Sequence, residues 1–264
     1  MCYDIHTMKL ICPICSEPLQ KEKQSAVCVN HHTFDYAKQG YLNLLLKQSK
    51  DHGDNPEMVK ARTEFLNTGA YQFLRDTLAA KVKAERCKVI ADLGCGEGYY
   101  TSALSADEKY GFDLSKDALK HASKNDLATN YVVASIFHLP FEDECCDAVI
   151  TCFAPAAISE ISRVLKSNGI FLFVTPGPRH LFEMKSVLYD TPYENTMEDL
   201  ATSLTLEKDE RIEQKFLCQQ EGLMHLFLMT PYAYKTSTVG REKLSLAGNL
   251  ELTAQFRIRT YRKK

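Results

Sequence analysis

Short apolar runs alternate with stretches of helical periodicity through the middle of the chain. The runs predict five strands, at residues 89–93, 109–112, 130–134, 147–153 and 170–175. Between them, helices are expected at 99–106, after Ser115 as a cap residue and at 159–165, with a turn at Asn168-Gly169. Strands that alternate with helices at this spacing predict an α/β fold with a parallel sheet.

The flanking segments continue this pattern. Asp54-Asn55-Pro56 supplies a cap and a first-turn proline for a helix at 57–65, and a second helix is expected at 71–85. Toward the C-terminus we expect a strand at 211–217, a helix at 219–229 and a strand at 250–261. In the last strand, Phe256 and Ile258 should face inward, and Arg257 and Arg259 outward. The mixed region 182–206 is a candidate lid.

Composition places the chain among soluble globular proteins. Of 264 residues, 25% are charged and 45% apolar, and 32 basic residues nearly balance 34 acidic ones. This balance excludes a wholly basic nucleic-acid coat and an acidic disordered tail. No apolar run approaches the roughly 20 residues of a membrane span, and no secretory signal is readable, so we expect a cytoplasmic protein without membrane association.

The first cysteines have the spacing of a zinc site. Cys12 and Cys15 form a Cys-x2-Cys pair, and after twelve residues Cys28 is followed by three residues and His32. Zn²⁺ prefers four such ligands in a tetrahedron, and four protein ligands make the metal structural. The spacing favours His32, but His31 remains an alternative. Ten cysteines without an export signal indicate metal binding or burial rather than disulfides.

Basic and aromatic residues surround this predicted zinc site. The basic ones are Lys9, Lys21, Lys23, Lys38, Lys47 and Lys50, and the aromatic ones are Phe34, Tyr36 and Tyr41. Such a mixture suits RNA phosphates and splayed bases, although it is also typical of a solvated surface over a small core.

A glycine-rich loop carries the clearest chemistry. The strand at 89–93 contains Asp92 and leads into Gly94-Cys95-Gly96-Glu97-Gly98. Dinucleotide sites use G-x-G-x-x-G, whereas this G-x-G-x-G loop with an acid before it suits a cofactor with a cationic amino-acid end. Asp113, 21 residues after Asp92, ends the next strand and can accept both ribose hydroxyls. Ser135 and Phe153 follow later strands, so all these residues are expected at the carboxyl edge of the sheet.

These motifs resemble those of a known family. Asp92 to Gly98 with Asp113 looks like the cofactor motif of class I S-adenosylmethionine (SAM) methyltransferases. With the cysteine pairs, Tyr99-Tyr100-Thr101, Phe153-Ala154-Pro155 and Thr175 to Leu181, the chain resembles the 23S ribosomal RNA guanine-N1 methyltransferases over nearly its whole length. The resemblance implies a Rossmann-like class I sheet of seven strands, an N-terminal zinc-binding module, a homodimer, and methylation of a guanine in a hairpin loop near the peptide exit tunnel.

The resemblance also assigns site residues. It implies that Cys12, Cys15, Cys28 and His32 bind structural zinc. The expected cofactor-binding residues are Tyr71, Asp92, Gly94, Gly96, Gly98, Tyr99, Tyr100, Thr101, Asp113, Ser135 and His180. No catalytic residue is assigned; the candidates are Phe153 and Pro155 as a wall for the target base, and His180 as a cofactor contact or a base. Ala156 stands where relatives often carry cysteine, so that position receives no chemistry.

The predicted organisation is a zinc-binding module at 1–50, a helical linker region at 51–87 and a methyltransferase domain at 88–264. Two rival functions remain at this stage: a class I methyltransferase for a small molecule or protein, and a non-catalytic RNA-binding protein with a methyltransferase fold. The sequence leaves open which guanine is modified, whether the methyl group confers antibiotic resistance, and the identity of the general base.

Overall fold

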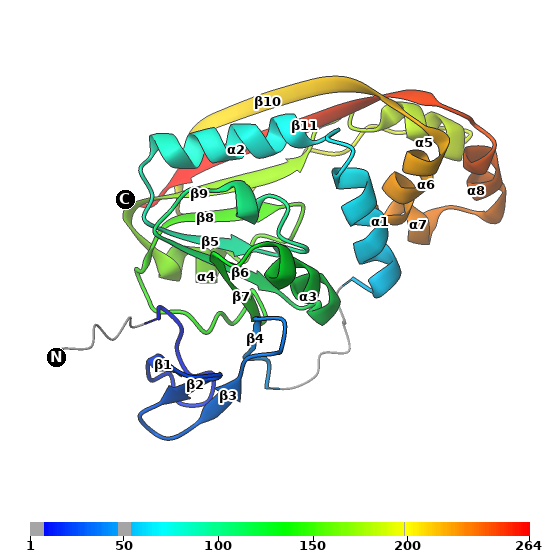
Figure 1. Ribbon diagram of the computed structural model, residues 1–264. Coiled ribbons are helices and arrows are strands. Elements are labelled where there is room, and N and C mark those ends of the chain that lie inside the picture. Colours follow the sequence, from blue (N-terminus) through cyan, green and yellow to red (C-terminus); the bar gives the residue numbers. More distant parts are fainter. Residues whose placement is uncertain (1–7, 47–53, 198) are drawn as a thin grey trace.

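A computed structural model describes residues 8–46, 54–197 and 199–264 (Figure 1). Its centre is an eight-stranded sheet with the order β10-β11-β9-β8-β5-β6-β7-β4. The strands in chain order are β4 (Leu42–Asn43), β5 (Val89–Leu93), β6 (Glu108–Asp113), β7 (Thr129–Val133), β8 (Cys146–Cys152), β9 (Leu165–Pro176), β10 (Thr205–Cys218) and β11 (Leu250–Arg262). Strands β4 to β9 are parallel, and β10 and β11 are antiparallel additions. The seven strands implied by the resemblance are therefore present, and β4 adds an eighth.

Helices pack on this sheet and at one end of it (Figure 1). They are α1 (Pro56–Leu66), α2 (Gln72–Ala84), α3 (Lys116–Asn125), α4 (Ile158–Val164), α5 (Phe182–Leu188), α6 (Gln220–Leu228), α7 (Tyr232–Lys235) and α8 (Thr238–Ser245). The expected caps are confirmed, because the side chains of Asn55 and Ser115 accept hydrogen bonds from the backbone N–H groups of Met58 and Ala118. Helices α6 to α8 are inserted between β10 and β11.

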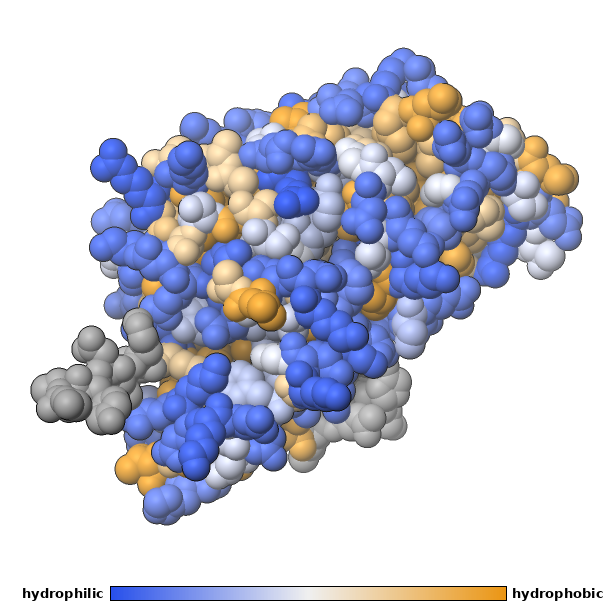
Figure 2. Space-filling model, in the orientation of Figure 1, coloured by the Kyte–Doolittle hydropathy of each residue, from blue (hydrophilic) through white to orange (hydrophobic). Residues whose placement is uncertain are grey.

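Both faces of the sheet are covered by apolar side chains. On β5, Ile90 faces one buried cluster with Leu74 and Phe256, whereas Ala91 and Leu93 face another with Phe112. A strand buried on both faces has a continuous apolar sequence, which explains the run at 89–93. On the outside, the face shown in Figure 2 is mostly hydrophilic, and its apolar surface is divided among separate small patches.

The N-terminal module packs directly against the large sheet. Its own sheet contains β1 (Leu19–Glu22), β2 (Ser25–Cys28) and β3 (Thr33–Asp35). Leu10 forms a bridge with Phe141, and β4 pairs with β7. Leu10, Leu19 and Leu42 are buried in the same apolar cluster as Phe112 and Phe141. The module and the large sheet therefore share one core.

The prediction of a helix at 99–106 is wrong. Only a 3-10 turn, η1 (Thr101–Ala103), forms there. The Lys109 ammonium donates to the carbonyl oxygens of Thr101 and Ser102, at 3.4 and 3.5 Å, which satisfies these acceptors without a further helical turn. The backbone is extended at Leu104 and enters β6 four residues later. The segment is thus too short for a longer helix.

Two smaller expectations also fail. Asn168 and Gly169 lie within β9, where Asn168 has a φ of +65° and the pairing with β8 shifts register, so the irregularity is absorbed in the strand instead of a separate turn. Arg259 is buried, not outward-facing, and its guanidinium lies 4.7 Å from the ring centroid of Phe173. The reason is that this face of β11 is also covered: Tyr261 packs there in a cluster with Leu204.

In the described parts of the chain, no helix combines the length and apolarity needed to cross a membrane.

Candidate functional site

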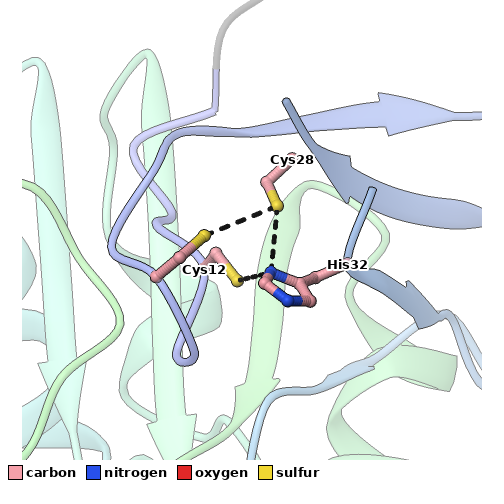
Figure 3. A group of neighbouring side chains, drawn as sticks. Cys12, Cys28 and His32 are labelled. Atoms are coloured by element: carbon pink, nitrogen blue, oxygen red, sulfur yellow. Dashed lines mark hydrogen bonds between the residues drawn. The ribbon is translucent and has the colours of Figure 1, made fainter. Parts of the chain in front are cut away.

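Three cysteines and one histidine of the N-terminal module converge on one point (Figure 3). The ligand atoms of Cys12, Cys15, Cys28 and His32 all lie within 4.8 Å of one another. Cys12 and Cys15 come from the turn before β1, whereas Cys28 ends β2. A hydrogen bond with the side chain of Asn30 lowers the pKa of the Cys15 thiol to about 6. The folded hairpin thus brings together the two halves of the predicted site.

Three distances within this cluster are close to those of a tetrahedral zinc site. The sulfur atoms of Cys15 and Cys28 are 3.7 Å apart, and Nδ1 of His32 is 3.5 Å from the sulfur atoms of both Cys12 and Cys28. A zinc ion at ordinary bond lengths requires edges of about 3.8 Å between sulfurs and about 3.6 Å between sulfur and nitrogen. The donor set and its spacing therefore suit Zn²⁺.

The structure also chooses between the two histidines. His31 has a φ of +60° and an exposed side chain, and its backbone N–H donates to the carbonyl of Cys28. The turn that His31 makes directs the next side chain, that of His32, toward the sulfur atoms. His31 thus shapes the loop, and His32 completes the cluster.

The glycine loop follows β5 at the carboxyl edge of the large sheet. Gly94 has a φ of +78°, and a Cβ placed on it would lie 2.5 Å from Cβ of Ala154. Only glycine combines this conformation with such a close approach to the segment after β8. A cavity of about 390 Å³ beside the loop is lined by Glu97, Gly98 and Tyr99 together with residues of α1 and α3. The loop therefore packs tightly against the segment after β8 at Gly94 and borders an open cavity at Glu97 to Tyr99.

Asp92 is buried directly beneath this loop. Its Oδ2 accepts a 2.6 Å hydrogen bond from the hydroxyl of Thr101, but its Oδ1 has no hydrogen-bond partner among the described residues. Burial raises the pKa of Asp92 to about 7. A buried carboxylate oxygen without a partner is costly, so this site suits a cationic donor that binds from outside the chain.

Asp113 ends β6 and faces the same loop. Its carboxylate accepts hydrogen bonds from the backbone N–H groups of Gly96 and Ser115, at 2.9 and 2.8 Å. Burial raises the pKa of Asp113, and these two hydrogen bonds partly oppose the shift. The predicted ribose acceptor is therefore held rigidly against the glycine loop.

A charged network that the sequence did not reveal covers this edge. Arg62 of α1 forms ion pairs with Asp54 and with Glu97, the latter at 3.3 Å. Burial raises the pKa of Glu97, and Arg62 opposes this rise. Arg62 is separated from the loop by more than 30 residues and stands in an ordinary amphipathic helix. No local pattern distinguishes it, and only the packing of α1 brings it to the site.

Tyr71 and His180 form a buried pair. The backbone N–H of Gln255 donates to Nδ1 of His180, so Nε2 carries the proton and donates to the Tyr71 hydroxyl at 3.2 Å. Burial lowers the pKa of His180 to about 3. The ring of Phe256 packs against both residues, with centroid distances of 4.9 and 4.8 Å. His180 is thus a neutral hydrogen-bond donor, which makes it a poor general base.

The segment after β8 adds an exposed aromatic surface. Phe153 has a φ of +61° and leaves 43% of its surface exposed. Its ring lies 6.2 Å from that of Tyr100 and 5.4 Å from that of Phe256. A bulky residue in the left-handed region is strained, and such strain is common at functional sites. Phe153 therefore stands out as a surface for a planar ligand.

The remaining predicted residues are more scattered. Pro155 is exposed two residues beyond Phe153, and Ser135 is half-buried just after β7, where its hydroxyl accepts from the Phe137 N–H. In the basic set, Lys21 lies over the ring of Tyr36, and Lys9 pairs with Glu142. Lys47 and Lys50 lie outside the described residues.

Comparisons with known proteins match both parts of this architecture. A family model described as "RlmA, N-terminal", a zinc ribbon, matches residues 10–52, and one described as "Methyltransferase domain" matches residues 91–173. The chain is 30% identical over 239 residues to the 23S rRNA (guanine(748)-N(1))-methyltransferase of Streptomyces fradiae, with 85% of each chain covered. It is also 30% identical over 243 residues to a protein of Bacillus subtilis (strain 168) provisionally named 23S rRNA (guanine-N(1)-)-methyltransferase YxjB, covering 84% of this chain and 86% of that one.

Proposed function

This chain belongs to the 23S rRNA (guanine-N1)-methyltransferase family, and from this premise we propose that it transfers a methyl group from SAM to N1 of a guanine in a hairpin loop of 23S rRNA. The observation that carries the proposal is the similarity over 85% of the chain, together with the matches of a zinc-ribbon model and a methyltransferase model. SAM is the cofactor and zinc the structural metal of this architecture.

The cofactor-binding role of the glycine loop rests on the groups that face it. Asp113 is the acceptor for the ribose hydroxyls, because it ends the second strand of the βαβ unit. Asp92 faces the cationic amino end, since its Oδ1 lacks a partner among the described residues. Gly94, Gly96 and Gly98 allow close approach, and the rest of the pocket consists of Tyr71, Tyr99, Tyr100, Thr101, Ser135 and His180.

The chemistry of the transfer makes orientation the main task of the protein. When bound, SAM supplies a methyl group on a sulfonium, which is a good leaving group. Holding N1 in line with that methyl group can contribute roughly 7–11 kcal/mol of the rate enhancement. We assign Phe153 and Pro155 to this task, as an apolar wall on which the target guanine stacks. Neutral guanine carries a proton on N1. His180 is unavailable to accept it, because its Nδ1 already accepts from the Gln255 N–H and its Nε2 carries a proton, so we assign this step to a carboxylate or to solvent.

The zinc site has a structural role in this proposal. Cys12, Cys15, Cys28 and His32 would fill all four positions of a zinc tetrahedron, which leaves no open position for a substrate. The metal would hold the turn between Cys12 and β1 against β2, and thereby present the basic and aromatic residues of the module to RNA.

Mass spectrometry of 23S rRNA fragments tests the function. We expect incubation with the protein and SAM to add about 14 Da, the mass of one methyl group, to a fragment that contains a hairpin guanine. Ribonuclease mapping then identifies the modified guanine.

Phe153→Ala should reduce turnover on RNA while leaving cofactor affinity unchanged. Phe137→Ala, which removes another exposed aromatic ring, is the matched control. Transfer to small amines or proteins but not to RNA would favour the rival methyltransferase function, and cofactor binding without any transfer would leave only an RNA-binding role.

Three further properties belong to the proposal because the family resemblance implies them. We propose a homodimer, to be measured by light scattering, and a cytoplasmic location, where ribosomal RNA is found. Resistance to a macrolide-type antibiotic depends on which guanine is methylated, and susceptibility of cells with and without the gene tests it.

A further inference from the structure

Arg62 occupies an unusual place for a residue of an N-terminal helix. Its Nη1 lies 2.8 Å from the position that a Cβ on Gly96 would take, so the guanidinium rests directly on the glycine loop. The side chain is only 19% exposed. An ion pair that served only to hold a surface helix would not need contact with the centre of this loop.

The charges around the guanidinium are mostly negative. Glu97 and Asp54 form ion pairs with Arg62, and Asp113 lies close enough to raise the pKa of Arg62. These carboxylates suit the sulfonium and amino groups of SAM but repel the carboxylate at its methionyl end. A cofactor with both charges therefore needs a cation at one point of this acidic edge.

From this arrangement, and resting on the proposed function, we propose that Arg62 is a cofactor-positioning residue whose guanidinium pairs with the methionyl carboxylate of SAM above the glycine loop. A guanidinium has five N–H donors, and the contacts with Glu97 and Asp54 engage one on each terminal nitrogen. Donors therefore remain for a third carboxylate, and guanidinium–carboxylate pairs are directional and strong when partly desolvated.

The surroundings of α1 hold Arg62 in place for this role. The Ser115 hydroxyl donates to the carbonyl of Asp54 at 2.7 Å, which ties the start of α1 to the end of β6. On the far side, Glu64 of α1 pairs with His225 of α6 at 2.9 Å. Helix α1 is thus fastened on both sides as a wall of the carboxyl edge, and Arg62 points from this wall onto the loop.

Calorimetric binding of two cofactors tests the proposal. Decarboxylated S-adenosylmethionine lacks only the carboxylate, so we compare it with SAM in the wild type and in Arg62→Gln. We expect Arg62→Gln to lose about 10- to 100-fold in affinity for SAM, as for a charged hydrogen bond, and less than about 3-fold for the decarboxylated compound. Arg62→Lys should fall between, because lysine keeps the charge but not the planar fork. Lys60→Gln removes the same charge from an exposed position of α1 and should change neither affinity.

Each other result has a definite meaning. An equal loss for both compounds would assign Arg62 a purely structural role and overturn the inference, as would no loss for either. Should Arg62→Gln fail to fold by circular dichroism, the ratio of the two affinities in Arg62→Lys decides in the same way. A wild-type protein that binds neither compound would instead contradict the proposed function itself.

Discussion

At the scale of single residues, burial determines what the acidic and basic groups of the site can do. Asp92 and His180 are both buried, and burial shifts their pKa values in opposite directions. It raises the pKa of the acid to about 7 and lowers that of the imidazole to about 3. Both shifts favour the neutral form. Burial therefore disfavours charge on Asp92 and His180, whereas Glu97 at the same edge is paired with the guanidinium of Arg62.

The shift at Asp92 predicts a pH-dependent stability. An acid with a raised folded-state pKa contributes stability that is complete below its unfolded pKa of 3.8 and is lost as pH rises through about 7. Asp92→Asn cannot ionise, so its stability relative to wild type should increase by roughly 2.5 kcal/mol between pH 5 and pH 8. Urea unfolding at the two pH values measures this. Asp117→Asn, at an exposed position of α3, is the control, and an equal offset at both pH values would contradict the prediction.

The buried Tyr71–His180 pair predicts a second effect. Tyr71→Phe removes the acceptor of the Nε2–H of His180 and leaves this donor buried without a partner, which should destabilise the fold by about 1–3 kcal/mol. Tyr234→Phe removes the hydroxyl of an exposed tyrosine and should cost less than about 0.5 kcal/mol. Thermal unfolding compares them. If the two variants melt alike, the hydrogen bond to His180 contributes nothing to stability.

At the scale of elements, the short connection between β5 and β6 supplies a hydrogen bond to Asp92 instead of forming a helix. The segment has no room for a helix, so Lys109 satisfies the carbonyls of η1, and Thr101 of the same turn bonds to Asp92. Residues of this short connection therefore contact the buried Asp92 instead of forming a helix. A full helical turn would direct Thr101 elsewhere.

The glycine loop gives a test at this scale. Gly94→Ala introduces a Cβ at a φ of +78° and 2.5 Å from Cβ of Ala154, and we expect a loss of at least 2 kcal/mol, roughly the left-handed penalty plus the overlap. Gly222→Ala places a Cβ in α6 at 3.5 Å from the nearest atom, which should stabilise the protein by about 0.5–1 kcal/mol. Denaturant midpoints of the two variants should thus move in opposite directions, and a harmless Gly94→Ala would refute the close-packing argument.

At the scale of the whole molecule, the zinc ribbon and the methyltransferase sheet behave as one body. The backbone N–H of Leu44 donates to the carbonyl of Val133, and Ile11 donates to that of Pro140. The shared apolar cluster contains Leu10 and Leu42 from the module and Phe141 from the large domain. Disorder in the module would therefore expose part of the core of the large sheet.

Removal of zinc should consequently lower the stability of the whole protein and not only that of the module. We expect a chelator to lower the melting temperature of the whole protein, because structural zinc contributes directly to folding. Cys28→Ser should melt at the lowered temperature with or without chelator. Cys218→Ser, at a buried cysteine distant from the cluster, should respond to chelator as the wild type does. If neither the chelator nor Cys28→Ser changes the melting temperature of the main unfolding transition, the module is energetically independent of the large sheet.

The sequence by itself determined the features that depend on local order along the chain. The glycine loop, Asp113, the caps at Asn55 and Ser115, and the cysteine spacing could be predicted because turn chemistry, strand ends and metal geometry act over a few residues. The alternation of apolar runs with helical segments likewise predicted the parallel sheet.

Only the tertiary structure decided the features that depend on which surfaces meet. Arg62 reaches Gly96 because α1 packs at the carboxyl edge, and Arg259 is buried because the second face of β11 is also covered. The choice of His32 over His31 follows from a backbone turn, and the shortened η1 follows from the ammonium of Lys109. Burial, desolvation and contacts between distant segments are properties of the folded chain, and no periodicity in the sequence encodes them locally.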